Sequence, residues 1–325
     1  MVKDCELHYK DSTEIKRFQE LRLRETLAYL AAHSPFYKRM FSEQNIDIDS
    51  IKTIEDMQRL PTTSKQDLQM HNFDFLCVDL LDVIDYVTTS GTLGEPVTFA
   101  LTENDLRRLA YNEASSFTMA GCSKKDVLQL MTTIDRRFMA GLAYFLGARE
   151  LGCGVVRVGN GIPELQWDTI NRVGATACIV VPSFLTKMIE FAEKNGIDPN
   201  SSSLKRAVCI GEALRLPNGE LTTLGKKINE KWQSLELFST YASTEMQTSF
   251  TECEIHRGGH VPADLVIVEM LDENRQPVSN GEEGEVTITT IGVEAMPLLR
   301  FRTGDIAVRF DEPCRCGRKS PRLSS

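Results

Sequence analysis

Short apolar runs alternate with longer amphipathic stretches between residues 83 and 250, and this alternation restricts the fold more than any other feature of the sequence. The apolar runs have the length of strands, and the stretches between them carry apolar residues at helical spacing. Strands that alternate with helices are typical of βαβ units, in which right-handed crossovers build a mostly parallel sheet. The predicted strands are Val83–Val87, Val127–Thr132, Gly154–Val158, Ala177–Val181, Ala207–Ile210 and Leu235–Phe238.

The chain before this region has a helical pattern over residues 12–60. Ser12 or Thr13 is the expected N-cap of a first helix, because their hydroxyls can accept a hydrogen bond from its first turn. Ser34 and Pro35 end that helix and begin a short second one, since proline is favoured at the first position of a helix.

After residue 260 the pattern becomes that of antiparallel strands. Leu265–Leu271 and Glu285–Thr290 are predicted strands, and a polar connection joins them into a hairpin or small barrel. The predicted domains are a helical part (1–82), an α/β part that binds the ligands (83–250) and a β-barrel-like part (251–325).

Composition excludes several classes of function. The 325 residues are 42% hydrophobic, which is enough for a sizeable core. A formal net charge of −9 argues against a nucleic-acid partner, which requires a basic face. No apolar leader begins the chain, and no apolar run approaches the ~20 residues of a membrane helix. Nine cysteines without a secretion signal indicate reduced thiols, so the predicted compartment is the cytoplasm.

A segment rich in serine, threonine and glycine, Thr88–Pro96, follows the first predicted strand of the α/β region. Its backbone N–H groups and hydroxyls suit the oxygens of a phosphate. The segment is not a Walker loop, because Gly-Lys-Ser/Thr does not follow at the required spacing. Taken alone, a strand-to-strand turn explains the same composition equally well.

A second polar segment, Ser239–Glu245, follows another predicted strand. Ligands of open α/β sheets tend to bind at the carboxyl ends of the strands. Tyr241 can stack on a base, Thr244 can contact a phosphate, and Glu245 can bind Mg²⁺. By itself, a helix N-terminus with capping hydroxyls and an acid in its first turn is the simpler interpretation.

A third segment, Leu299–Asp305, is predicted to be a polar turn between apolar strands. The Asp305 carboxylate can accept two hydrogen bonds from ribose hydroxyls, although an aspartate in a Thr-Gly-Asp sequence is more often only a turn residue. None of the three segments is specific by itself.

In their order and spacing, these segments resemble the phenylacetate–CoA ligase family of the acyl-adenylate-forming (ANL) superfamily. The resemblance covers nearly the whole chain and implies two α/β subdomains with mostly parallel sheets, plus a small distorted β-barrel. The matching segments are Ser34–Tyr37, Leu60–Thr63, Ser90–Pro96, Ile210–Ala213, Tyr241–Glu245, Gly281–Glu285, Arg300–Asp305 and Cys316–Arg318.

The resemblance also implies a nucleotide site and an acid pocket. Thr244 would contact the α-phosphate and Glu245 would bind Mg²⁺, while Asp305 would hold the ribose. The other implied nucleotide-binding residues are Ser90, Gly91, Thr92 and Gly94 around the phosphates, Gly211, Glu212 and Tyr241 beside the adenine, and Ala213, Ala242 and Ser243 in the same segments. The implied acid pocket is lined by Phe138, Ala140, Gly141 and Phe184, of which the two phenylalanines fit a plain core role equally well.

The implied reaction is ATP-dependent activation of an aromatic or arylacetic acid, such as phenylacetate, to an acyl-adenylate, followed by transfer to CoA. Transfer to another thiol, or nucleotide and acid binding without turnover, is the alternative. Relatives carry a further small domain with a lysine that closes the site, and this sequence ends at Ser325 before such a lid, so the chain alone is expected to be impaired. The phosphate loop departs from many relatives at Leu93 and lacks their lysine after Pro96. A homodimer is left open.

Four residues near the end of the chain suggest a metal site. Cys253 and His260 lie in one short segment, and Cys314 and Cys316 form a close pair. Three sulfurs and one imidazole are a set that a closed tetrahedral zinc site uses, and some relatives carry a similar pattern. His256 is the alternative nitrogen ligand, and four unrelated surface residues are the alternative to a site. The cysteines predicted to be core thiols are Cys5, Cys77, Cys122, Cys153, Cys178 and Cys209.

Overall fold

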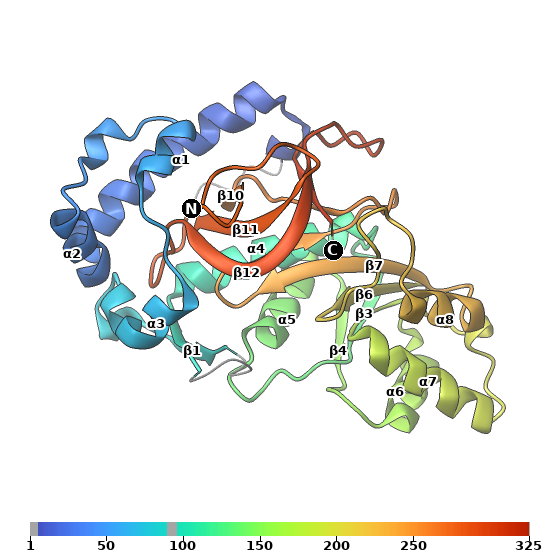
Figure 1. Ribbon diagram of the computed structural model, residues 1–325. Helices are drawn as coiled ribbons and strands as arrows, with labels where there is room; N and C mark the ends of the chain where they lie inside the picture. Colours follow the sequence, from blue (N-terminus) through green and yellow to red (C-terminus); the bar gives the residue numbers. More distant parts are fainter. Residues whose placement is uncertain (1–5, 90–95, 325) are drawn as a thin grey trace. The chain divides into compact units, whose positions relative to one another are not determined.

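The structure is a computed structural model that describes residues 6–89 and 96–324 (Figure 1). The chain forms two compact units, each built from segments that are far apart in the sequence. The first unit contains Met1–Arg108, Ser243–Thr248 and Val261–Pro321, and the second contains Leu109–Ala242, Ser249–His260 and Arg322–Ser325. The predicted division into three parts, at residues 82 and 250, stays a prediction.

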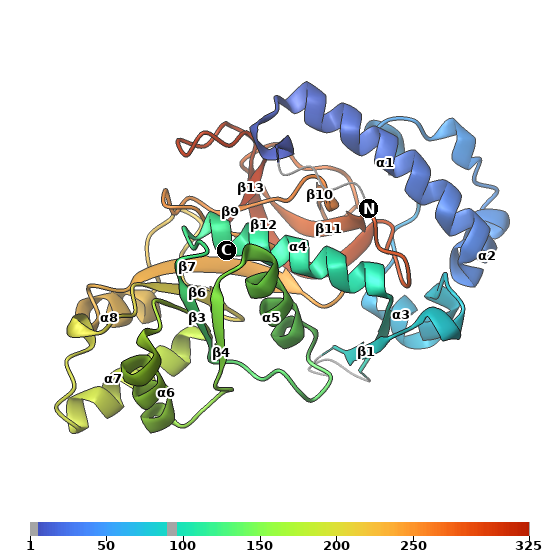
Figure 2. The same cartoon turned by 180° about the vertical axis from the view of Figure 1, so that it is seen from behind.

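A parallel sheet lies at the centre of the second unit (Figure 2). Its strands pair in the order β4–β3–β5–β6–β7, which confirms the predicted α/β class with a mostly parallel sheet. The strands are β3 (Val127–Leu130), β4 (Gly154–Arg157), β5 (Ala177–Val180), β6 (Arg206–Ile210) and β7 (Glu236–Ser243). The helices of this part of the chain are α4 (Glu103–Met119), α5 (Met139–Leu151), α6 (Pro163–Thr169), α7 (Pro182–Lys194) and α8 (Thr223–Lys231), with short turns η6 (Ile170–Gly174) and η7 (Pro199–Ser201).

Helices cover both faces of this sheet, so alternate side chains of one strand enter different cores. Val180 of β5 packs in a core with Trp167 of α6 and with Trp232. The rings of the two tryptophans stack with their centroids 5.0 Å apart. Its neighbour Ile179 packs in the other core with Tyr144 of α5. Because both of its faces are buried, β5 is apolar without interruption, which is why it stands out in the sequence.

Short antiparallel strands complete the second unit. They are β8 (Thr248–Thr251), β9 (Gly259–His260) and β13 (Arg322–Leu323), in which β9 pairs with both of the others. The prediction of core thiols is confirmed for Cys122, Cys178 and Cys209, which are buried here. None of the helices in the described ranges has the length and apolar character needed to span a bilayer.

The first unit begins with helices that carry strong N-terminal caps. Asp11, and not the predicted Ser12 or Thr13, caps α1, because its carboxylate and Glu14 form a reciprocal capping box. Ser34 caps α2 as predicted, accepting a hydrogen bond from the Tyr37 N–H. The helical elements are η1 (Leu7–Tyr9), α1 (Ser12–His33), α2 (Pro35–Glu43), η2 (Ile48–Ser50), η3 (Glu55–Arg59), α3 (Lys65–His71), η4 (Asn72–Phe75) and η5 (Leu80–Asp82).

The strands of the first unit are antiparallel. β1 (Asp85–Thr88) pairs with β2 (Thr98–Leu101), and β10 (Val266–Leu271), β11 (Glu283–Thr290) and β12 (Phe301–Phe310) pair in that order. The predicted hairpin of residues 265–290 is therefore confirmed, whereas closure of these strands into a barrel stays a prediction. The predicted turn at Leu299–Asp305 is wrong, because residues 301–305 lie inside β12.

Candidate functional site

The loop after β6 is the best-defined part of the predicted nucleotide site. Gly211 adopts a left-handed conformation (φ 75°) that glycine alone adopts at no steric cost, so the chain turns sharply as it leaves the strand. The Glu212 carboxylate accepts a hydrogen bond from the Ser183 N–H at 2.8 Å and so caps α7, which has no cap from its own N-cap residue. The predicted adenine residues therefore lie at the carboxyl edge of the parallel sheet.

Arg215, which the sequence did not single out, fastens this loop to the sheet. Its Nε donates to Glu252 Oε2 at 3.1 Å, and its two terminal nitrogens donate to the carbonyls of Gly219 and Leu237. Glu252 is 1% exposed and also accepts the Ser239 N–H at 3.0 Å. A buried carboxylate thus ties the loop after β6 to β7.

The second polar segment is mostly strand, not a loop or helix start. β7 continues through Ser243, so Tyr241 and Ala242 lie in the strand, and the chain turns only at Thr244 and Glu245. Both sequence interpretations of Ser239–Glu245 placed the end of the strand too early. Tyr241 is half-buried and packs edge-on against Phe250 at 5.7 Å.

Arg108 holds the turn that follows Glu245 within the first unit. Its terminal nitrogens donate to the Gln247 carbonyl at 2.6 Å and to Thr248 Oγ1 at 3.0 Å, and its Nε donates to the Ile291 carbonyl. Burial lowers the pKa of Arg108 to about 10, so it stays charged at neutral pH. Its partners are scattered along the chain, which left no local signal in the sequence.

Asp305 is exposed on β12, and its backbone N–H donates a hydrogen bond to Thr303 Oγ1 at 3.1 Å. Beside it, the Gly304 N–H donates to Glu285 Oε1 at 3.1 Å, and Arg302 pairs with the same carboxylate. The pairing of β11 and β12 shifts register here, which indicates a bulge. A bulge therefore presents Asp305, where the sequence predicted a turn.

The phosphate-loop residues Ser90, Gly91, Thr92 and Gly94 lie outside the described residues. The strands on either side are tied together, since the Thr89 N–H donates to the Val97 carbonyl at 3.0 Å and the Val97 N–H donates to Thr89 Oγ1 at 3.1 Å. The segment thus connects two antiparallel strands, as the turn interpretation requires.

One of the four predicted acid-pocket residues, Phe184, lines a cavity in the second unit. This cavity has a volume of 470 Å³, and its lining does not include Phe138, Ala140 or Gly141. A Cβ at Gly141 would lie 2.0 Å from the Thr133 carbonyl oxygen, so this glycine is needed for close packing of α5. The Phe138 side chain is 36% exposed, which does not fit the alternative of a plain core residue.

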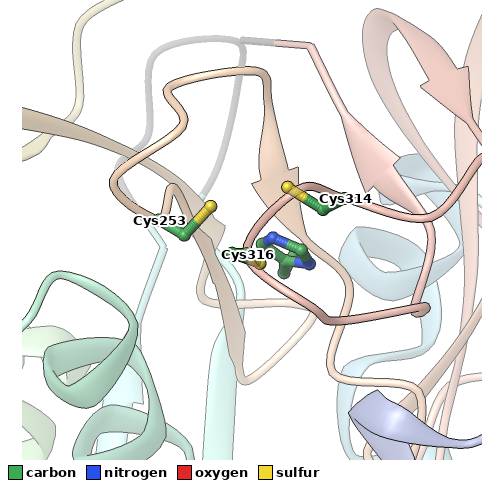
Figure 3. Close-up of side chains that lie close together, drawn as sticks. Cys253, Cys314 and Cys316 are labelled. Atoms are coloured by element: carbon green, nitrogen blue, oxygen red, sulfur yellow. The ribbon is translucent and has the colours of Figure 1, made fainter.

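Cys253, His260, Cys314 and Cys316 lie together, and their ligand atoms are all within 4.8 Å of one another (Figure 3). Three of these four residues are buried. Their three sulfurs and one imidazole fit the donor set of a closed zinc site. The alternative ligand His256 is not in this group, because its ring nitrogens lie 3.3 Å from Glu236 and 3.5 Å from Glu252.

One buried acid of the second unit was not singled out by the sequence. Glu113 on α4 accepts a hydrogen bond from Asn112 at 2.8 Å, and Asn112 also contacts Ser249 at 2.8 Å. Burial raises the pKa of Glu113 from 4.5 to about 7. Its other carboxylate oxygen has no hydrogen-bond partner among the described residues.

Comparisons with known proteins agree on one family. A family described as "AMP-binding enzyme" matches residues 39–295. A phenylacetate–coenzyme A ligase of Thermus thermophilus is 31% identical over 99% of this chain and 72% of its own length. A phenylacetate–coenzyme A ligase of Escherichia coli is 29% identical over 96% of this chain and 71% of its own length.

Solved structures show the same fold. A 2-hydroxyisobutyryl-CoA ligase in complex with 2-HIB-AMP and CoA superposes with a TM-score of 0.88 at 22% identity, covering 99% of this chain and 78% of that one. A long-chain-fatty-acid–CoA ligase of Archaeoglobus fulgidus superposes with a TM-score of 0.58 at 19% identity, over 75% of this chain and 51% of that one. At these identities the likeness concerns the fold.

Proposed function

The chain belongs to the AMP-binding enzymes, within the phenylacetate–CoA ligase family, and from this premise we propose that it joins an aromatic or arylacetic acid to CoA at the expense of ATP. The observation that carries the proposal is the match to a phenylacetate–coenzyme A ligase over 99% of the chain. The acid would first form an acyl-adenylate with release of pyrophosphate, and the CoA thiol would then displace AMP.

The chemistry requires that negative charge be neutralised. A carboxylate that attacks the α-phosphate brings two anions together, so the site must supply a cation and aligned donors. Glu245 is proposed to hold Mg²⁺ and Thr244 to contact the α-phosphate, at the turn that Arg108 fastens through Gln247.

The rest of the nucleotide is assigned to the other predicted segments. Gly211, Glu212 and Tyr241 are proposed to flank the adenine, and Asp305 to hold the ribose. The sharp turn at Gly211 and the exposure of Asp305 on β12 support these roles. The residues of the same segments proposed to bind nucleotide are Ser90, Gly91, Thr92, Gly94, Ala213, Ala242 and Ser243.

The test is product analysis with ATP, Mg²⁺, CoA and a panel of acids that includes phenylacetate, benzoate and acetate. Acid-dependent release of pyrophosphate, together with the matching CoA thioester, is expected for an aromatic acid. Pyrophosphate release without thioester in the presence of CoA would indicate another acceptor thiol. Nucleotide binding without pyrophosphate release for any acid, in the chain joined to the lid domain that relatives carry, would refute the ligase assignment.

A structural zinc ion is proposed as a second feature of this chain. Cys253, His260, Cys314 and Cys316 support it through their donor chemistry and their closeness. When bound, the ion would tie the segment of Cys253 and His260 to the Cys-x-Cys pair and add its binding free energy to folding.

A further inference from the structure

The cavity of 470 Å³ is lined by residues that directly follow strands β3 and β5. Its lining is mainly apolar, with Met131 and Val181 following those strands and Phe184 on α7. Lys187 is the one charged residue of the lining. Such a cavity suits the apolar part of a small molecule.

This cavity is next to the loop that is proposed to hold the adenine. A Cβ at Gly211 would lie 4.0 Å from the Val181 side chain, and Glu212 hydrogen-bonds to Ser183, beside Phe184. All of these residues belong to the second unit. An acid with its apolar part in the cavity would therefore lie beside the nucleotide loop.

The remaining wall of the cavity is a loop in an unusual conformation. Gly159, Gly161 and Ile162 have φ angles of 83°, 80° and 50°. A β-branched residue in the left-handed region is strained, and Ile162 is also 64% exposed, so its side chain gains little burial in return. Backbone strain that is not offset by burial of the side chain is typical of a position that contacts a ligand.

A buried glutamine holds this loop in place. Gln166 on α6 is fully buried, and its Nε2 donates to the carbonyls of Gly159 at 2.8 Å and Gly161 at 3.1 Å. The Gln166 Oε1 accepts a hydrogen bond from Gln129 of β3 at 2.7 Å, which fixes the orientation of the amide. The side-chain amides of Gln166 and Gln129 thus hold the conformation of this loop.

We propose that Ile162 is a specificity-determining residue that contacts the apolar end of the acid, and that Gln166 is the positioning residue that holds it there. The proposal rests on the proposed function and extends it to residues outside the predicted pocket. The ligand class is a carboxylic acid with an apolar ring or branched chain, large enough to reach Ile162.

The test compares Ile162→Ala, Gln166→Leu and a control, Glu164→Gln, an exposed residue of the same helix. Pyrophosphate release is measured with phenylacetate and with acetate, which is too short to reach the loop. Ile162→Ala should raise the KM for phenylacetate about tenfold, because several methylene-sized contacts are lost, and leave the KM for ATP unchanged. Gln166→Leu should act in the same direction, and Glu164→Gln should behave as the wild type.

The outcomes separate this inference from the proposed function. Equal KM values for phenylacetate in the wild type and Ile162→Ala would overturn the inference and leave the ligase assignment intact. A rise of the KM for ATP that equals the rise for phenylacetate would do the same, since it indicates general damage. If Gln166→Leu does not fold, Ile162→Ala alone decides. A wild type that releases no pyrophosphate with any acid, when joined to the lid domain that relatives carry, would refute both.

Discussion

Replacing Arg215 with methionine would show how strongly the loop after β6 is held. The guanidinium is 12% exposed and its partner Glu252 is 1% exposed, so water screens this ion pair little. In Arg215→Met the Glu252 carboxylate keeps the Ser239 N–H but loses its buried counter-charge. Removing one partner of a buried pair typically costs ~3–5 kcal/mol, and we expect a loss of unfolding free energy in that range.

The assay is urea unfolding followed by tryptophan fluorescence. The sequence has only two tryptophans, Trp167 and Trp232, and both lie in one core of the second unit, so the signal reports this unit. Arg172→Met is the matched control, because Arg172 forms an exposed pair with Asp168 and its loss should leave the midpoint unchanged.

A double-mutant cycle with Glu252→Gln decides whether the pair itself is responsible. Each single variant leaves one buried group without its partner, whereas the double variant Arg215→Met/Glu252→Gln removes both charges. The double variant should therefore cost clearly less than the sum of the singles. Costs that add to within ~0.5 kcal/mol would show that the two residues act independently and would refute the reasoning.

Three further predictions follow from single groups. Asp305→Ala should weaken ATP binding by ~1–3 kcal/mol through lost ribose hydrogen bonds, and an unchanged dissociation constant in calorimetry would contradict the role. Elemental analysis of protein purified without added metal should give close to one zinc per chain, and Cys316→Ser should reduce it; freely titratable thiols at Cys314 and Cys316 would contradict the site. Because burial raises the pKa of Glu113 from 4.5 to about 7, its contribution to stability is complete below pH 4.5 and is lost as the pH rises through about 7. Glu113→Gln should remove up to ~3 kcal/mol of that pH dependence in unfolding titrations, and an unchanged profile would refute it.

The resemblance in the sequence led to the family, and the comparisons confirmed it, because motif order and spacing over nearly the whole chain are specific even when each motif is weak. The sites themselves are less settled. The phosphate-loop residues lie outside the described residues, and the roles of Thr244, Glu245 and Asp305 stay predictions.

What the sequence determined by itself is local. The strands β3, β4, β5 and β6 were predicted to within a few residues, because apolar runs mark buried strands. The end of β7 was placed too early, at Phe238 instead of Ser243, and Val83–Val87, predicted for the same sheet, forms the antiparallel strand β1. The start of α2 was predicted from Ser34 and Pro35, since capping depends on neighbouring residues. The start of α1 was missed by one residue, because Asp11, Ser12 and Thr13 are all good caps and only the contact with Glu14 distinguishes them.

Only the tertiary structure decided which polar residues serve as anchors. Arg108, Arg215 and Gln166 find their partners in segments remote in sequence or in a backbone shape that no local pattern specifies. The start of β12, residues 301–305, was mistaken for a turn for the same reason, because its polar residues are satisfied by Glu285 of the adjacent strand. Hydrogen bonds and ion pairs depend on distance in space, whereas hydrophobic periodicity reflects only burial. For this reason the fold class could be predicted from the sequence, but not the residues that hold its sites in place.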